Sequence, residues 1–164
     1  MAVKLKTIGI YGAIAAGVYG YNMLTEAERD STGSIVTEGR VDAFQMRIGD
    51  CFDDVASNGS DGELEITEIP GVPCSQPHDN EVYAIYDVTE TSFPTGHMDE
   101  IAFNGCMERF EAFVGKDYQA SSLDIFTMYP TPESWAQRQD REVICAVYDL
   151  NLTKLTGSAK GRAL

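Results

Sequence analysis

The stretch that decides the fold class is residues 81–88, which read EVYAIYDV. β-Branched and aromatic residues dominate it, and its apolar side chains occupy both faces of an extended chain. This pattern favours a strand at the centre of a sheet rather than at its edge. Residues 142–150, EVICAVYDL, are the strongest remaining strand candidate. The chain is therefore expected to be built around a sheet that includes these two segments.

The segments around these two strands predict the rest of the sheet. Further strands are expected over residues 41–48, 63–68 and 123–128, where apolar and polar side chains alternate. Between the second and the central strand, residues 69–73 (IPGVP) are expected to interrupt regular structure because they contain two prolines and a glycine.

Two helices are expected to pack on this sheet. Residues 98–114 have an amphipathic pattern that Gly115 can terminate. Thr131 followed by Pro132 is typical of the start of a second, shorter helix, which would end near Arg138. The predicted order is β-β-β-α-β-α-β with short connections, so the fold class is α+β with a small, mostly antiparallel sheet.

The segment before the domain, residues 7–24 (TIGIYGAIAAGVYGYNML), carries no charge and follows Lys4 and Lys6. A helix of this length, at ~1.5 Å per residue, spans about 27 Å, which is just enough to cross the hydrocarbon core of a bilayer. The lysines predict that residues 1–6 are cytoplasmic, so that everything from Thr25 onward lies outside the cell membrane.

A cleaved signal peptide is the alternative interpretation of this segment. Ala13-Ile14-Ala15 has the small-x-small form that signal peptidases accept. Cleavage there would leave an apolar region of only residues 7–12, shorter than the usual ~7–15 residues. Both interpretations place the domain outside the membrane.

The expected span carries two lanes of small residues, because residues four apart share a helix face. The lanes consist of Gly9, Ala13 and Gly17, and of Gly12, Ala16 and Gly20. Small residues let a second helix approach closely, which is how helices associate in lipid. We expect the span to pack into a membrane protein complex, although single spans without a partner are also often rich in glycine and alanine.

The domain after the span is strongly acidic. It contains 26 acidic and 10 basic residues, a net charge of −16. Nucleic acid is excluded as a partner because its phosphates would be repelled. A protein partner outside the membrane is compatible with this charge, and so is a simple role in solubility. We expect a linker over residues 25–40, the domain over 41–155 and a flexible tail over 156–164.

Four cysteines in an outward-facing domain of this size are expected to form two disulfides. Spacing alone permits three connectivities. We favour Cys51–Cys74, which would close a hairpin-like segment, and Cys106–Cys145, which would join a helix to a late strand. Thiolate ligation of a metal is not expected, because the chain has no C-x-x-C pair.

Residues 57–68 (SNGSDGELEITE) match part of a calcium-binding EF-hand loop, with Asp61 at the fifth position and Glu68 at the twelfth. The first position is Ser57 and lacks a carboxylate, and no amphipathic helix precedes the loop. An acidic turn is therefore favoured over a calcium-regulated surface module.

His78 is the second candidate for chemistry, since a histidine beside carboxylates can act as a base or a metal ligand. His97 is the only other histidine, and no third ligand or serine partner stands at a favourable spacing. We expect His78 to be bonded to the backbone near the Cys74 bridge, and the single Trp135 to lie in the core or an interface. No catalytic residue, metal or cofactor is predicted.

Several segments between residues 48 and 161 are distinctive when taken together. They are Gly49–Phe52, Val72–Ala84, Cys106 with the helix end at 110–115, Pro130–Ala136, Arg141–Cys145 and Leu155–Gly161. With these segments the chain resembles the septum-formation family of actinobacterial envelope proteins. One departure is Gln139, where a glycine is expected before Asp-Arg; this is expected to alter only a turn.

The resemblance implies a small extracytoplasmic domain, often carried on one membrane helix, and the family name points towards cell division. Under this resemblance Pro77, His78, Trp135 and the bridged cysteines are residues of the fold, and no catalytic residue is implied. Fold membership alone does not determine function.

These observations predict a non-enzymatic, membrane-anchored extracytoplasmic interaction domain. We expect it to be an accessory subunit of a larger cell-envelope complex, such as the division machinery or a respiratory or transport assembly. The alternative is a protein that binds or hydrolyses the cell wall through His78 and nearby carboxylates.

Overall fold

A computed structural model of the chain describes residues 2–4, 25–55 and 63–164. Its strands are β1 (Ala2–Lys4), β2 (Glu28–Arg29), β3 (Ile35–Thr37), β4 (Gly39–Asp42), β5 (Cys51–Phe52), β6 (Glu63–Glu65), β7 (Glu68–Val72), β8 (Asn80–Asp87), β9 (Leu123–Tyr129) and β10 (Glu142–Asp149). Its helices are α2 (Met98–Val114), α3 (Pro132–Arg138) and the short 3-10 helices η1 (Ala43–Gln45) and η2 (Tyr118–Ala120).

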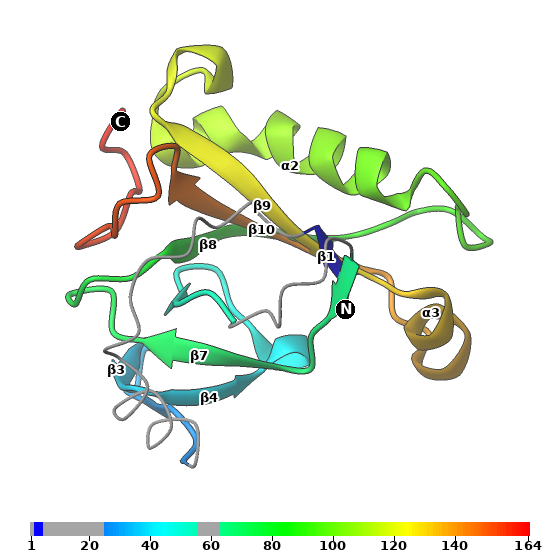
Figure 1. Ribbon diagram of the computed structural model, residues 1–164, viewed down its shortest axis with the longest axis horizontal. Helices are drawn as coiled ribbons and strands as arrows, with labels where there is room; N and C mark the ends of the chain where they lie inside the picture. The colour runs from blue at the N-terminus through cyan, green and yellow to red at the C-terminus, as the bar shows by residue number, and fades with distance from the viewer. Residues whose placement is uncertain (1, 5–24, 56–62) are drawn as a thin grey trace.

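One antiparallel sheet organises the described chain (Figure 1). The strand order is β4-β7-β5-β8-β10-β9-β1-β6, and β2 and β3 form a separate hairpin. The segment predicted to be central, β8, pairs with β5 on one side and with β10 on the other. The predicted α+β class with a mostly antiparallel sheet, two helices and two disulfides is therefore confirmed.

Both faces of the central strands are buried, each in its own core. The first core lies between the sheet and α2, which covers β8, β9 and β10 (Figure 1). The second core lies where the sheet curls, so that β4 and β7 contribute to the same cluster as β9 and β10. The first core includes Tyr83, Phe110, Val114, Val143 and Val147, and the second includes Val41, Ile69, Phe126, Ile144 and Ala146.

The two predicted helices begin and end at the expected signals. Gly115 follows α2 in the left-handed conformation (φ 82°), and its N–H donates to the carbonyl of Glu111 over 2.8 Å. Thr131 caps α3 in a reciprocal arrangement with Ser134, whose N–H donates to Thr131 Oγ1 over 3.0 Å. Local sequence therefore specifies both helices.

The two disulfides join Cys51 to Cys74 and Cys106 to Cys145, the connectivity that we favoured from the sequence. The second links α2 to the central strand β10 across the first core. By loop-closure entropy, each bridge is worth about 3–4 kcal/mol to the folded state.

Two predictions along the sheet are wrong. The strand expected over residues 41–48 ends at Asp42, whose carboxylate accepts the N–H of Phe44 and begins η1. Alternate residues then no longer share a face, so Ile48 is 59% exposed. Residues 69–73 do not interrupt the sheet, because β7 continues through Pro70.

Pro70 is tolerated in β7 because the strand needs only its carbonyl oxygen at that position. That oxygen accepts the N–H of Asp53 over 2.9 Å, and the residue opposite Pro70 on β4 is Arg40. A proline removes one donor from a strand and leaves its acceptor intact. The two prolines in residues 69–73 therefore do not end the strand, contrary to the prediction.

Residues 25–40, predicted as a linker, belong to the folded domain. They form the β2–β3 hairpin and the start of β4, and Ile35 is buried in the second core. The hairpin is fastened by Arg29, whose two terminal nitrogens donate to both carboxylate oxygens of Asp50 over 2.6 and 2.7 Å. Arg29 and Asp50 are 21 residues apart in sequence, so the polar pattern of residues 25–40 alone could not predict this contact.

The tail, residues 156–164, lacks regular secondary structure as predicted, but it is not a loose end. The N–H of Gly161 donates to the carbonyl of Phe113, and that of Ala163 donates to the carbonyl of Val114. Ala159 is fully buried within the first core. The tail therefore covers the C-terminal end of α2.

The N-terminal strand β1 pairs with β9 on one side and β6 on the other. This placement differs from the expected cytoplasmic location of residues 1–6, because a strand hydrogen-bonded to β9 lies on the same side of a membrane as β9. Residues 7–24, the expected span, are outside the described residues. In the remainder, no helix combines the length and apolar character needed to cross a bilayer.

Replacement of Gly105, inside α2, tests how closely this helix lies on the sheet. A helix-interior glycine-to-alanine change usually stabilises by about 1 kcal/mol. Here the new Cβ would lie 2.1 Å from the Tyr86 hydroxyl, which donates to the carbonyls of Ile101 and Ala102. We expect Gly105→Ala to lower the free energy of unfolding by about 1 kcal/mol, measured by urea denaturation.

The same change in a Tyr86→Ala background removes the obstruction and should stabilise instead. Asn104→Ala, at an exposed neighbouring position of α2, is the control and should change stability by a few tenths of a kcal/mol. A Gly105→Ala variant that is more stable than the parent would contradict the close approach.

Candidate functional site

His78 lies just before the start of the central strand β8 and is fully buried. Its backbone N–H and carbonyl pair with those of Leu155 over 2.9 and 2.8 Å. Its ring Nδ1 lies 2.8 Å from the carbonyl oxygen of Gln76. Because a carbonyl oxygen can only accept, Nδ1 carries a hydrogen and is satisfied, whereas Nε2 is buried without a partner among the described residues.

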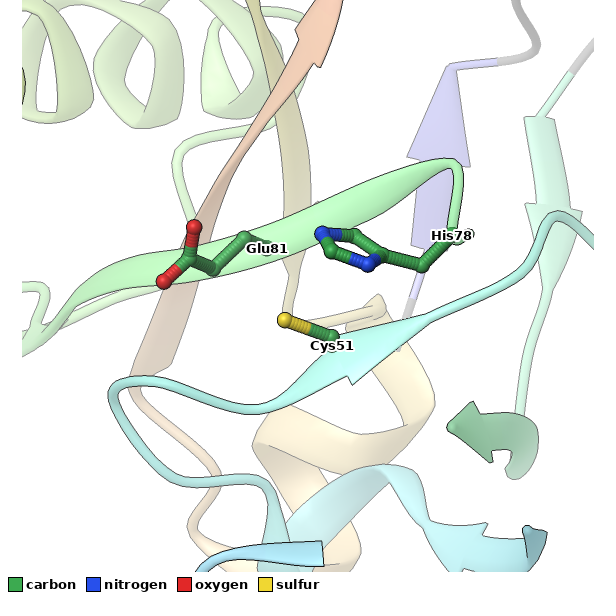
Figure 2. Close-up of side chains that lie close together, drawn as sticks. All are labelled: Cys51, His78 and Glu81. Atoms are coloured by element: carbon green, nitrogen blue, oxygen red, sulfur yellow. The ribbon is translucent and has the colours of Figure 1, made fainter. Parts of the chain in front are cut away.

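Cys51 and Glu81 lie beside this ring, as Figure 2 shows. One potential ligand atom from each of Cys51, His78 and Glu81 lies within 4.8 Å of the others. The register of the sheet causes this proximity, since Cys51 of β5 stands opposite Glu81 of β8. The structure therefore brings the sulfur of Cys51 to a histidine and a carboxylate that are about 30 residues further along the chain.

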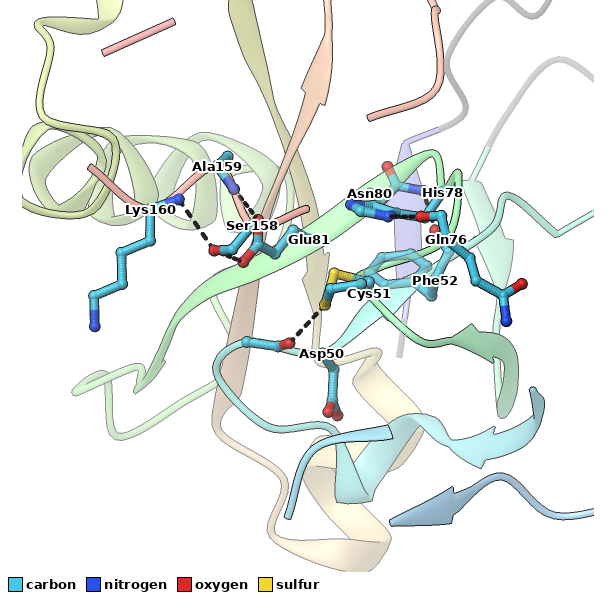
Figure 3. Close-up of a disulfide and its surroundings, with 12 residues drawn as sticks. Asp50, Cys51, Phe52, Gln76, His78, Asn80, Glu81, Ser158, Ala159 and Lys160 are labelled. Atoms are coloured by element: carbon cyan, nitrogen blue, oxygen red, sulfur yellow. Dashed lines mark hydrogen bonds between the residues drawn. A yellow bond between two sulfur atoms is a disulfide. The ribbon is translucent and has the colours of Figure 1, made fainter. Parts of the chain in front are cut away.

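Glu81 holds the tail in place (Figure 3). Its side chain is 1% exposed, and its two oxygens accept one hydrogen bond each from Ser158 Oγ (2.5 Å) and from the N–H of Ala159 (2.6 Å). Hydrogen bonds to a buried carboxylate are among the stronger ones in proteins. Glu81 is therefore a structural anchor for the tail.

These engagements leave the cluster little capacity for chemistry. The sulfur of Cys51 is bonded to Cys74 and offers no thiolate, and both oxygens of Glu81 are occupied by the tail. A general base must also reach its substrate, and the His78 side chain is fully buried. The geometry agrees with the expected structural role of His78.

A second charged group lies next to this cluster and serves to join loops. Lys154 Nζ is 2.5 Å from Asp53 Oδ1 and 3.2 Å from Asp79 Oδ2. Desolvation lowers the pKa of Lys154, but the hydrogen bond to Asp53 and the charges of Asp79 and Asp53 outweigh it, so the pKa is raised above its usual value. Lys154 thus remains a cation that ties the segment after β10 to the loops flanking β5 and β8.

The other residues singled out in the sequence lie apart from His78. Trp135, on α3, is buried in the first core, where its ring packs edge-on against the ring of Phe93. The guanidinium carbon of Arg141 lies 3.5 Å from the centre of the Trp135 ring. Pro77 is exposed in the turn before His78. The small-residue lanes (Gly9, Gly12, Ala13, Ala16, Gly17 and Gly20) fall outside the described residues.

The structure also opposes a calcium site in residues 57–68, because the glutamate expected to be its principal ligand lies in a strand. Ser57 and Asp61 are outside the described residues, but Glu68 belongs to β7 and its carboxylate accepts from Arg40 Nη1 over 3.0 Å. An EF-hand needs the glutamate at this position as a bidentate ligand at the start of a helix, not in a strand.

The structure also forms a pocket of about 410 Å³ that sequence patterns did not predict. We call it the arginine pocket, because Arg29, Arg40, Arg47 and Arg138 line it. They come from β2, β4, the segment after η1 and the end of α3. The remaining lining residues are Glu26, Ala27, Val41, Asp42, Phe44, Gln45, Thr67 and Glu68.

Two of these arginines are paired with acids. Arg29 makes its two-pronged contact with Asp50, which is 2% exposed, and the hydrogen bonds with Asp50 raise the pKa of Arg29 against the opposing effect of burial. Arg40 pairs with Glu68, but its Nε is buried without a partner among the described residues. Both side chains are thereby held in place at the pocket wall.

The other two arginines have no acid partner within the described chain. The guanidinium of Arg138 lies 4.8 Å from the centre of the Phe44 ring. That of Arg47 lies against Gly33, where an added Cβ would be 2.6 Å from Nη1. Gly33 has φ of 90°, so the β2–β3 turn both requires a glycine and gives Arg47 room.

Comparison with known proteins gives the family. A model of the septum formation family matches residues 25–145. The chain belongs to the septum formation family. The match begins at Thr25, so the hairpin β2–β3 and Arg29 lie inside the family domain, whereas β1 lies outside it.

No curated protein matches the chain, and no solved structure does. The family assignment therefore rests on the family model, and it agrees with the resemblance carried by the cysteine segments. The structure also explains the departure at Gln139. This residue follows α3 with φ of 56°, the left-handed region in which glycine is the favoured residue.

Substitution of Glu81 tests whether this carboxylate anchors the tail. We expect Glu81→Ala to lower the free energy of unfolding by about 2–3 kcal/mol, since it removes two hydrogen bonds and leaves the buried N–H of Ala159 unpaired. It should also speed hydrogen exchange at the amides of Gly161 and Ala163, which bond to α2. Urea denaturation and NMR-detected exchange measure the two effects.

Glu111→Ala is the matched control, because Glu111 is exposed on α2 and its side chain makes no described contact. Equal protection of the tail amides in both variants would show that Glu81 does not hold the tail.

Proposed function

We propose that the chain is a non-enzymatic, membrane-anchored interaction domain that acts outside the cell membrane in septum formation. The observation that carries this proposal is the family match over residues 25–145, which covers the sheet through Cys145 and both disulfides. A division-related role is what the family indicates.

The contacts already made by His78, Cys51 and Glu81 support a non-enzymatic role. The alternative, a protein that hydrolyses the cell wall through His78, needs that ring to reach a bulky substrate. Its full burial, its backbone pairing with Leu155 and the occupied oxygens of Glu81 all oppose such access.

Membrane anchoring is supported by the uncharged run at residues 7–24 and by the lysines before it. Insertion with a cytoplasmic N-terminus requires β1 to separate from β9. Insertion would break two residue pairs between β1 and β9, Ala2 with Tyr129 and Val3 with Met128, and the three pairs between β1 and β6. The match to the family model begins after this segment, at Thr25.

Reporter fusions to the full chain test this topology. Alkaline phosphatase, which is active only outside the cytoplasm, should be active when fused after Leu164, and a fluorescent protein that folds only in the cytoplasm should fluoresce when fused before Met1. A control chain with Lys4 and Lys6 changed to Glu should weaken this bias. A non-fluorescent N-terminal fusion with an active C-terminal one would favour β1 remaining in the sheet.

We further propose that the span packs into a larger membrane complex as an accessory subunit. The two small-residue lanes support close helix packing, and the acidic domain offers a surface to a protein partner outside. The family favours the division machinery over a respiratory or transport assembly as that complex.

A mild-detergent pull-down with mass spectrometry tests the complex. Tagged full-length protein should recover a stoichiometric membrane partner. Changing Gly12, Ala16 and Gly20 to leucine should reduce recovery at least tenfold, because bulky residues prevent close approach of the helices.

The matched control changes Ile10, Ile14 and Val18 to leucine, which adds three leucines on another face of the same helix and should leave recovery unchanged. Recovery of the protein alone in every case would reject the accessory-subunit proposal. It would favour the alternative, a protein that binds the cell wall.

A further inference from the structure

The arginine pocket gathers cations in a domain that has few of them. Four of the domain's 10 basic residues line it, whereas the domain as a whole has a net charge of −16. Its acids are Glu26, Asp42 and Glu68, and Asp50 lies behind Arg29. The pocket is therefore locally balanced and is a place where a negative group can approach an otherwise repelling surface.

Some charged groups of the arginine pocket are paired with one another, and others are not. Asp50 pairs with Arg29 and Glu68 pairs with Arg40. The Asp42 carboxylate accepts the N–H of Phe44, and neither Asp42 nor Glu26 has an arginine or lysine partner among the described residues. The donors left over are the buried Nε of Arg40 and the guanidinium groups of Arg47 and Arg138. A buried donor without an acceptor is costly, and an incoming oxygen would remove that cost.

The walls of the pocket are prearranged to hold these donors. Arg29 and Asp50 fix the β2–β3 hairpin, Gly33 provides the surface on which Arg47 lies, and Phe44 supports Arg138. Guanidinium groups present paired donors that match carboxylate and phosphate oxygens. Arg47 and Arg138 are exposed, so a small oxyanion can reach both guanidinium groups.

We propose that the arginine pocket binds the carboxylate or phosphate group of a small ligand through Arg47, Arg138 and the Nε of Arg40. This deepens the proposed interaction role by giving the domain a specific ligand-binding site. The site depends on the domain alone and not on the span, so it can be tested apart from the pull-down.

The test is an NMR titration of the full chain in uncharged detergent micelles, with inorganic phosphate in one arm and acetate in the other. We expect saturable shifts at the amides of Phe44, Gln45 and Arg47, with midpoints in the millimolar range. Arg47→Gln and Arg138→Gln should each raise the midpoint at least fivefold. Arg162→Gln, which removes the same charge from the tail, should leave it unchanged.

Sodium chloride at matched ionic strength is the reference for unspecific screening. Saturation with phosphate alone assigns a phosphate ligand, and saturation with acetate alone assigns a carboxylate ligand; either result supports the site. Shifts that only follow ionic strength, or equal midpoints in Arg47→Gln, Arg138→Gln and Arg162→Gln, would overturn it. The unperturbed amide spectrum outside the pocket verifies that each variant is folded.

Discussion

The burial of both faces of β8 and β10 is the constraint on which the rest of the structure depends. A strand buried on both sides needs a covering layer on each, and the domain meets this need in two ways. Helix α2 covers one face, and the curl of the sheet brings β4 and β7 over the other. The disulfides follow the same plan, because Cys145 ties α2 to β10 and Cys51 ties the strand beside β8 to the loop after β7.

Asp50 connects this framework to the arginine pocket. It precedes Cys51, and its carboxylate receives Arg29 from the hairpin and the backbone N–H of Arg47. One buried carboxylate thus sets the position of the hairpin relative to the sheet and, through it, two walls of the pocket. On the other side of the same strand pair, Glu81 performs a comparable task for the tail. In both cases a buried carboxylate holds a distant segment of the chain against the sheet.

The helices were predicted correctly from local signals, whereas the strand over residues 41–48 and two segments that depend on distant contacts were not. The limits of α2 follow from its amphipathic pattern and Gly115, and the start of α3 follows from Thr131 and Pro132. The hairpin over residues 25–40 and the ordered tail were missed, because Arg29 and Ser158 find their partners 21 and 77 residues away. The strand expected over 41–48 failed because Asp42 caps a helical turn within an alternating pattern.

The sequence by itself determined the α+β class, the central strands, the helices, a favoured disulfide pairing and the family, because periodicity, caps and cysteine segments act locally. Only the tertiary structure decided which candidate functional residues lie close together and which are buried. It placed His78 out of reach between Cys51 and Glu81, and it gathered Arg29, Arg40, Arg47 and Arg138 around one pocket. These groupings arise from strand register and from the curl of the sheet, which join residues that have no pattern in common along the chain.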